Sequence, residues 1–137
     1  MTGPVVYGDD ERTLITALVA AFDGRDEAYI PAAESIRIGF PNSPLVSETA
    51  IQVDHETTDT VSHAMREWPQ TRITCWAAAG QRDDVKDLAS LTQGLLEQMP
   101  DVRVLIGRSS VATDPDTKNL AVWILIKTSL RGTQLAS

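Results

Sequence analysis

The sequence predicts an α+β fold, in which a mixed and mainly antiparallel sheet of about four or five strands is flanked by two helices on one face. Two segments carry apolar residues at helical spacing, and several others alternate apolar and polar residues as strands do. Helices and strands do not alternate along the chain, which favours an α+β layer over a parallel α/β sheet. The 137 residues, 42% of them hydrophobic, suit one domain over residues 1–137.

The first predicted element is an amphipathic helix that follows a lead of residues 1–8. Asp9 and Asp10 place negative charge where a helix N-terminus favours it, and Gly24 marks the end of the helix. Apolar residues recur along it every three or four positions: Leu14, Ile15, Leu18, Val19 and Phe22.

Two short strands are predicted next, at residues 35–39 and 50–56, where apolar and polar side chains alternate. Between them, Pro41 and Pro44 fix the backbone away from helix and remove two N–H donors, so Phe40 to Glu48 is expected to be a surface loop. The residues expected on the apolar side of the two strands are Ile36, Ile38, Ile51, Val53 and His55.

A third strand is predicted at residues 71–78, after a polar segment. In that polar segment we expect a turn of helix around residues 61–65, ended by Pro69. The alternation of the strand places Ile73, Cys75 and Ala77 on one face and Arg72, Thr74 and Trp76 on the other.

The second helix follows Gly80, and Pro100 ends it. Asp83 and Asp84 supply the negative charge at its start. Its apolar residues recur at helical spacing: Val85, Leu88, Leu91, Leu95 and Met99.

The rest of the chain predicts a hairpin. Strands are expected at residues 102–106 and 120–130, and Asp114-Pro115-Asp116-Thr117 supplies the chemistry of a turn. Residues 132–137 follow as a tail without pattern.

The charge balance argues against a protein that tracks nucleic-acid phosphates. Nineteen acidic and twelve basic residues give a net charge of −7, and no run of Lys or Arg forms a basic footprint. With Cys75 as the sole cysteine, neither an intrachain disulfide nor a cysteine zinc cage is available. No stretch has the pattern of a secretion signal or the length of a membrane span.

The residues that could carry chemistry do not form a known constellation. His55 and His63 stand near Asp54, Glu56 and Asp59, but their spacing matches no zinc motif, so a solvent-facing strand end is the favoured interpretation. Cys75 is in phase with the apolar residues of its strand, which favours a buried side chain over a nucleophile. Residues 107–110 lack the second glycine and the lysine of a phosphate-binding loop.

Two further groups are assigned to structure or to contacts. Asp114 and Asp116 flank Pro115 and suit a turn better than a cation site, because calcium needs six or more oxygen ligands. Trp76 and Trp123 lie mid-strand, out of phase with the aliphatic residues. Either the helices cover that face and both indoles are core, or a tryptophan anchors a subunit interface, where this residue is enriched.

From Arg72 to Gly132 the chain resembles tail terminator proteins of long-tailed actinobacterial phages, which are similar to the lambda-type terminator family. The order and spacing of several short segments carry the resemblance. They are Cys75-Trp76-Ala77, Asp87-Leu88-Ala89, Gly94-Leu95-Leu96, Asp114-Pro115-Asp116-Thr117 and Leu130-Arg131-Gly132-Thr133, with Val6-Tyr7-Gly8-Asp9 and Glu11-Arg12 at the start.

The resemblance implies a structural virion protein without enzymatic activity or cofactor. Such a protein forms a ring of six copies on the last ring of the tail tube, stops tube polymerisation and offers a surface to the head-side connector or stopper protein. DNA passes through its lumen without specific binding, and no membrane is involved. The protein is assembled in the host cytoplasm and stays at the neck end of the virion tail.

We expect the contact elements to be the turn from Asp114 to Lys118 and the loop from Phe40 to Glu48, because loops on a rigid sheet adapt to a partner. The interface residues expected from the sequence are Trp76, Asp114, Asp116, Lys118, Trp123, Pro41 and Pro44.

Two alternatives remain open. One is another neck protein, such as a head completion or stopper protein. The other is a small α+β ligand-binding module or enzyme, which requires a concave pocket that holds His55, Asp54 and Cys75 together.

Overall fold

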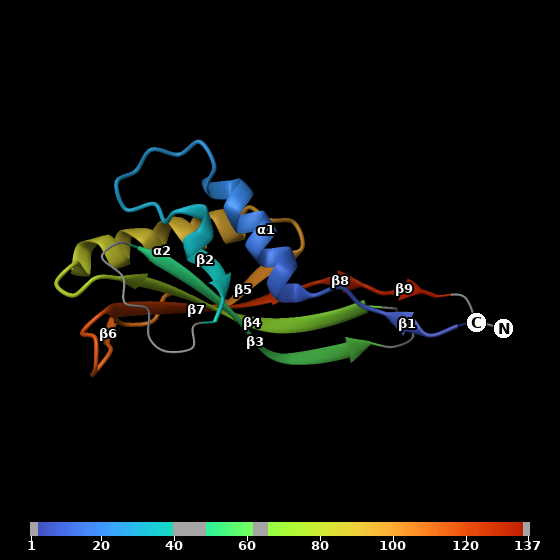
Figure 1. Ribbon diagram of the computed structural model, residues 1–137. Coiled ribbons are helices and arrows are strands. Elements are labelled where there is room, and N and C mark those ends of the chain that lie inside the picture. The colour runs from blue at the N-terminus through green and yellow to red at the C-terminus, as the bar shows by residue number, and fades with distance from the viewer. Residues whose placement is uncertain (1–2, 40–48, 62–65, 136–137) are drawn as a thin grey trace.

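The computed structural model describes residues 3–39, 49–61 and 66–135. Two α-helices lie on one face of a mixed sheet, as predicted, and a separate two-stranded ribbon joins the ends of the chain (Figure 1). The elements in chain order are β1 Val5–Val6, α1 Asp10–Phe22, a 3₁₀ turn Ala33–Ser35, β2 Ile36–Ile38, β3 Ala50–Val61, β4 Arg66–Ala77, α2 Arg82–Glu97, β5 Val102–Ile106, β6 Ala112–Thr113, β7 Leu120–Thr128, β8 Leu130–Arg131 and β9 Thr133–Gln134.

The main sheet has the strand order β2-β3-β4-β7-β5, with the short β6 beside β7 and the short β8 beside β4. All of these pairs are antiparallel except β2 and β3, which are parallel. The sheet therefore has seven strands rather than four or five. The difference is due to β6 and β8, whose two residues each are too few to give an alternating pattern.

The core lies between the helices and the sheet. Helix α1 begins where Asp9 Oδ1 accepts hydrogen bonds from the backbone N–H groups of Glu11 and Arg12, at 3.0 and 3.3 Å. Every second residue of β7, from Leu120 to Thr128, is buried under the helices. The largest buried side chains of the core are Leu14, Leu18, Ile51, Ile73, Leu88, Leu96, Ile124 and Ile126.

A helical turn was expected around residues 61–65, but Val61 belongs to strand β3. Strand β4 begins directly after this range, at Arg66. Residues 62–65 themselves lie outside the described residues. Pro69 does not end an element but lies within β4, where Trp68 and Pro69 pair with β3 opposite the gap between β7 and β8. A proline has no N–H to donate, and at that gap no ladder bond is lost.

The two isoleucines of β2 differ in burial although they share one side of the strand. Ile36 is buried, as expected, whereas Ile38 is 46% exposed. Strand β2 lies at the edge of the sheet, beside β3. The hydrophobic core therefore includes Ile36 and ends before Ile38.

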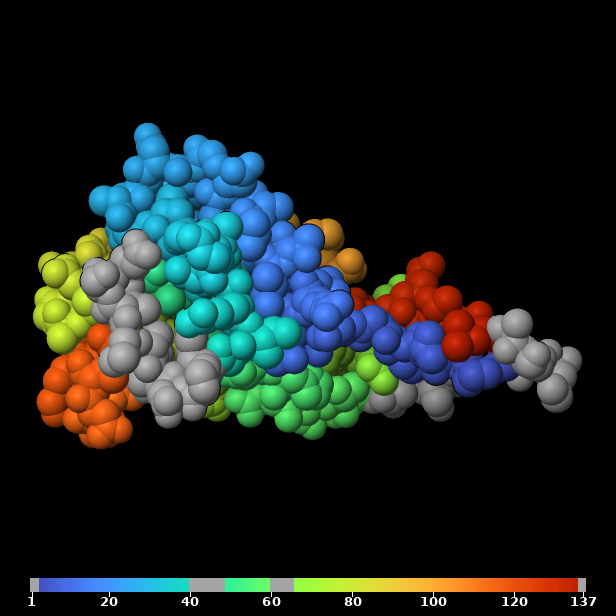
Figure 2. All heavy atoms as spheres, viewed as in Figure 1, coloured from blue at the N-terminus to red at the C-terminus, as the bar shows by residue number. Residues whose placement is uncertain are grey.

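The two ends of the chain form a projecting ribbon, where the sequence predicts only a lead and a tail. Strands β1 and β9 pair antiparallel, with Val5 opposite Gln134 and Val6 opposite Thr133. Leu135 donates its backbone N–H to the carbonyl of Pro4, at 2.8 Å. We call residues 3–6 and 133–135 the terminal arm, which extends away from the body of the molecule (Figures 1 and 2). Strands of two residues carry no alternation that could predict them.

Gly132 allows the two ends to meet. A Cβ atom at this position would lie 2.5 Å from Cγ1 of Val5 and 2.9 Å from Cε1 of Tyr7, both closer than real Cβ contacts allow. Since valine is stiff at χ1 and Tyr7 is a ring, neither neighbour yields easily. Glycine is therefore required where β8 passes into β9.

We expect Gly132→Ala to separate β1 from β9 while the core stays folded. Hydrogen exchange at the amide of Leu135 should rise, and the cooperative melting of the core should change little. Gly94→Ala is the matched control, since Gly94 lies in α2 with open space at its Cβ, and it should add about 1 kcal/mol to the stability. A Gly132→Ala protein with unchanged exchange at Leu135 would contradict this account.

Candidate interaction surface

All three tryptophans of the chain lie on the sheet face that the helices leave uncovered, which we call the open face. Trp76 on β4 and Trp123 on β7 alternate with buried residues that pack under the helices, and both are half-buried. Trp123 of β7 pairs with Thr74 of β4. Trp76 is the next residue of β4 whose side chain lies on the same face as that of Thr74, so the two indoles are diagonal neighbours. The interpretation that the helices cover these indoles is therefore wrong.

Trp68 is the tryptophan that the sequence interpretation missed. It precedes Trp76 on β4 by an even number of residues, and the register between β4 and β7 is continuous, so the two side chains lie on the same face. The same parity is present in the sequence. It had no meaning there because the expected helical turn and Pro69 separated Trp68 from the predicted strand.

Polar and cationic groups hold the rings of Trp76 and Trp123 in place. Nε1–H of Trp76 donates to Oε1 of Gln52 at 3.0 Å. The guanidinium of Arg72 lies 4.6 Å from the centre of the Trp123 ring, and its Nε is 2.8 Å from Oε1 of Glu56. A cation over an indole face is attracted by the ring, and the carboxylate fixes the cation there. At this face, the Trp76 indole is thus hydrogen-bonded and the Trp123 indole packs against a cation that has a carboxylate beside it.

Trp68 borders a surface hollow of about 610 Å³. The Lys127 ammonium lies 5.7 Å from the centre of the Trp68 ring and 3.5 Å from Oδ2 of Asp59. The hollow lies where β3 and β7 end and where β4 and β5 begin. Arg103 of β5 is part of its lining. It is shallow and mixed in polarity, as a contact surface is.

Two cations of the open face pair with carboxylates of β3. Arg72 and Lys127 face Glu56 and Asp59, two carboxylates of β3. Cations that already have carboxylate partners are poorly placed to follow a phosphate backbone. Two cations of this aromatic face are therefore engaged with carboxylates, whereas Arg103 of β5 lies exposed opposite Lys127 at its edge.

The turn from Asp114 to Lys118 connects β6 to β7 at the Trp76 end of the open face. Oδ1 of Asp114 accepts the backbone N–H groups of Thr117 and Asp116, at 2.9 and 2.8 Å. The hydrogen bond from Thr117 is the largest cause that lowers the pKa of the Asp114 carboxyl, and the bond from Asp116 lowers it further. Lys118 has a φ of +63°, and its ammonium donates to the carbonyl of Pro115 at 3.0 Å. The turn is confirmed, and its two exposed charged residues are Asp116 and Lys118.

Pro41 and Pro44, the other residues expected at an interface, lie outside the described residues. The structure thus brings Trp76, Trp123 and the Asp114 turn to one end of the open face, and it does not place the 40–48 loop.

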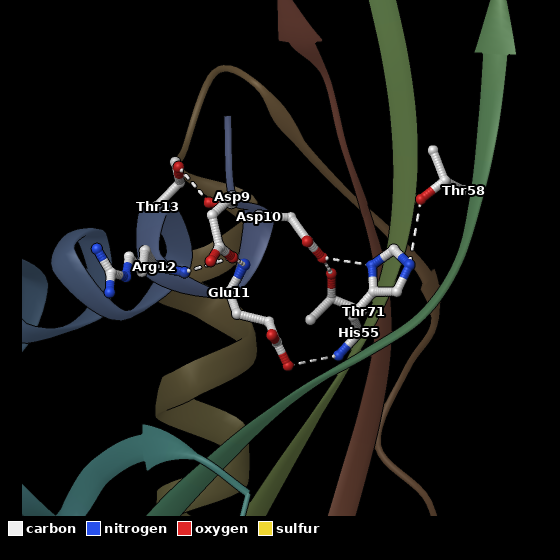
Figure 3. A network of polar contacts seen from close by, with 8 residues as sticks. All are labelled: Asp9, Asp10, Glu11, Arg12, Thr13, His55, Thr58 and Thr71. Atoms are coloured by element: carbon white, nitrogen blue, oxygen red, sulfur yellow. Dashed lines mark hydrogen bonds and ion pairs between the residues drawn. The ribbon is translucent and has the colours of Figure 1, made fainter. Parts of the chain in front are cut away.

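A polar network joins the start of α1 to β3 and β4 (Figure 3). Oδ2 of Asp10, which is buried, lies 3.0 Å from Nδ1 of His55 and accepts the hydroxyl of Thr71 at 2.7 Å. The backbone N–H of His55 donates to Oε2 of Glu11 at 3.0 Å, and the hydroxyl of Thr58 lies 3.1 Å from Nε2 of His55. His55 is therefore not simply a solvent-facing strand end, although its side chain is 37% exposed.

The network positions a helix, and we see no ligand site in it. The contacts run from the Asp10 carboxylate to the His55 imidazole and from there to the Thr58 hydroxyl. Acyl-transfer enzymes use the same three groups in the same order. However, other residues line four hollows of the described surface. In the described residues, no three His, Cys, Asp or Glu side chains are grouped to hold a metal ion, and His63 lies outside them.

The residues required by the small-enzyme alternative point in different directions. Cys75 faces α2, with Sγ 3.7 Å from the hydroxyl oxygen of Thr92, and it is fully buried as predicted. His55 contacts the start of α1, whereas the carboxylate of Asp54 accepts from the Gln52 amide on the open face. None of the four hollows described on the surface is lined by Cys75, His55 or Asp54.

Comparison with known proteins gives this chain no family: no family model matches it, and no curated protein matches it. Within residues 3–39, 49–61 and 66–135, neither helix has the length and apolarity needed to cross a bilayer. The open face and the turn beside it are therefore the features from which a function is inferred.

We expect Asp10→Ala to destabilise the fold by about 1–3 kcal/mol, because it leaves the buried hydroxyl of Thr71 without its acceptor. Denaturant unfolding measures the change. Thr13→Ala is the control, since it removes an exposed hydroxyl from the same helix and should cost less than about 0.5 kcal/mol. Equal losses in the two variants would contradict a holding role for the network.

We expect Cys75 to resist alkylation in the folded chain. Burial raises the pKa of its thiol to about 12, so the reactive thiolate is scarce at about pH 8 and the sulfur is covered. Iodoacetamide should modify the chain in denaturant and leave the native chain intact, as mass spectrometry can measure. Rapid modification of the native protein would mean that Cys75 is accessible.

Proposed function

We propose that this chain is an assembly subunit that acts by binding and not by catalysis, and that its assembly is the tail terminator ring of a long-tailed phage. One observation supports the binding role above all others. The three tryptophans lie on a sheet face that nothing in the described chain covers. Single exposed apolar residues are ordinary on protein surfaces, but three indoles on one face are not.

The way in which the indoles are held supports the same role. Tryptophan is enriched among residues that dominate binding energy, and rigid side chains lose little entropy when a partner docks. Gln52 holds Trp76, and Arg72 with Glu56 holds Trp123. Such pre-organisation suits a surface whose task is to be covered.

In the proposed assembly, copies of the chain form a ring, of six by the resemblance, on the last ring of the tail-tube protein. The ring ends tube growth and offers its other side to the head-side connector or stopper protein at the neck of the virion. The net charge of −7, with Arg72 and Lys127 already paired, suits a channel through which DNA passes without sticking.

The nearest alternative is another neck protein, such as a head completion or stopper protein, which would use the same kind of surface. The two proposals differ in partner. A terminator binds tail-tube protein, whereas a stopper binds the portal-side adaptor. Binding to these two proteins therefore separates the alternatives.

The test measures the mass of the purified chain by light scattering, alone and mixed with its tail-tube protein. We expect a ring-sized species, in one or both conditions. A chain that stays monomeric and ignores the tube protein would overturn the terminator proposal.

We further expect the double substitution Trp76→Ala and Trp123→Ala to weaken that association by about 2 kcal/mol or more, which is roughly thirtyfold in Kd. Circular dichroism should show that the folded content is kept. Thr16→Ala, on the exposed side of α1, is the control and should leave the association unchanged. Undiminished association in the tryptophan variant would mean that the open face is not the binding surface.

A further inference from the structure

The terminal arm has apolar side chains that the described part of the chain leaves exposed. Val6 is 43% exposed and Leu135 is 45% exposed. The ribbon has two register pairs and belongs to a sheet of its own. A lone two-stranded ribbon is marginally stable in water, so an arm of this kind gains from an outside contact.

A complementary hollow lies at the other end of α1, which we call the α1 groove. Its volume is about 200 Å³, and Asp23 and Gly24 stand at its rim. Its apolar lining consists of Val19, Phe22, Ile30, Pro31, Ala33 and Ile36.

The arm and the α1 groove lie at opposite ends of one helix. The arm adjoins the start of α1, where Gly132 meets Val5 and Tyr7, and the groove adjoins its end at Phe22. A helix of 13 residues is about 20 Å long. Figures 1 and 2 show the arm pointing away from the body, so it does not fold back onto this groove. The arm of the same copy therefore does not fill this groove, and the arm of a second copy is free to reach it.

The charges of the two surfaces are complementary. The last turn of α1 has no basic residue, and Asp23 at its C-cap adds negative charge to the negative end of the helix dipole. Asp26 is exposed close by, whereas Glu27 is paired with Arg25. At the base of the arm, Arg131 is an exposed cation. A cation delivered to the end of α1 would offset the charge that the chain itself leaves there.

We propose that the terminal arm of one copy packs into the α1 groove of the next, with Leu135 and Val6 against the apolar lining and Arg131 facing Asp23. This contact rests on the proposed ring. It joins two different surfaces of the chain, and such heterologous contacts close into rings when the rotation permits. The open face then remains available for the tail-tube protein or the head-side partner.

A charge-swap experiment on the full chain tests the contact. Asp23→Arg and Arg131→Asp are made singly and together, and association is followed by light scattering, with and without the tail-tube protein. Each single variant should weaken self-association by roughly tenfold or more, and the double variant should recover most of the loss. Lys86→Glu, an exposed charge reversal on α2, is the control and should behave as the parent.

A cross-linking experiment keeps the test valid even if a charge variant folds poorly. Leu135→Cys chains are mixed with Ala33→Cys chains and treated with a short flexible bismaleimide, while buried Cys75 stays unreactive. A mixed dimer should form, and neither chain alone should give as much. Absence of the mixed dimer in a sample that assembles would overturn the contact.

The outcomes separate this contact from the function on which it rests. If the parent chain assembles and the charge variants assemble equally well, or the double variant does not recover, the arm contact is wrong and the ring proposal stands. If the parent chain assembles in no condition, both are wrong. Recovery in the double variant together with the mixed dimer supports both.

Discussion

The packing of both helices on one face of the sheet is the constraint on which the other features depend. Because β4 and β7 alternate, residues such as Ile73 and Ile124 enter the core, and the residues between them must face away. Nothing in the described chain covers those residues, so Trp76 and Trp123 stay half-buried. The open face is the direct consequence of a two-layer fold with tryptophans on the outer side.

The polar network at the start of α1 fixes the orientation of this helix on the sheet. Asp10 reaches both β3 and β4 through His55 and Thr71, so one buried carboxylate fixes the helix on the sheet. The direction of α1 then decides where its two ends lie. The terminal arm adjoins one end and the α1 groove the other, which makes the two surfaces of the proposed contact dependent on one interaction.

The parts of the fold that periodicity can encode were predictable from the sequence. Both helices, the alternation around Cys75 and the Asp114 turn follow from local patterns and are confirmed. Long-range pairing was not predictable, because no local pattern links β1 to β9 or Asp10 to His55. Of the site, Trp76 and Trp123 were found, but the open face was left undecided since only the placement of the helices shows which side of a strand is covered.

The chemistry of the open face indicates what kind of contact it favours. Two of its cations, Arg72 and Lys127, already pair with Glu56 and Asp59, so docking gains little from new ion pairs at these two residues. The favourable free energy of docking comes from removing indole surface from water. Salt screening hardly affects this hydrophobic contribution. The Arg131 and Asp23 contact between arm and groove is different, because both groups are exposed and it depends on charge. Salt should therefore weaken the contact between copies more than the contact made through the open face.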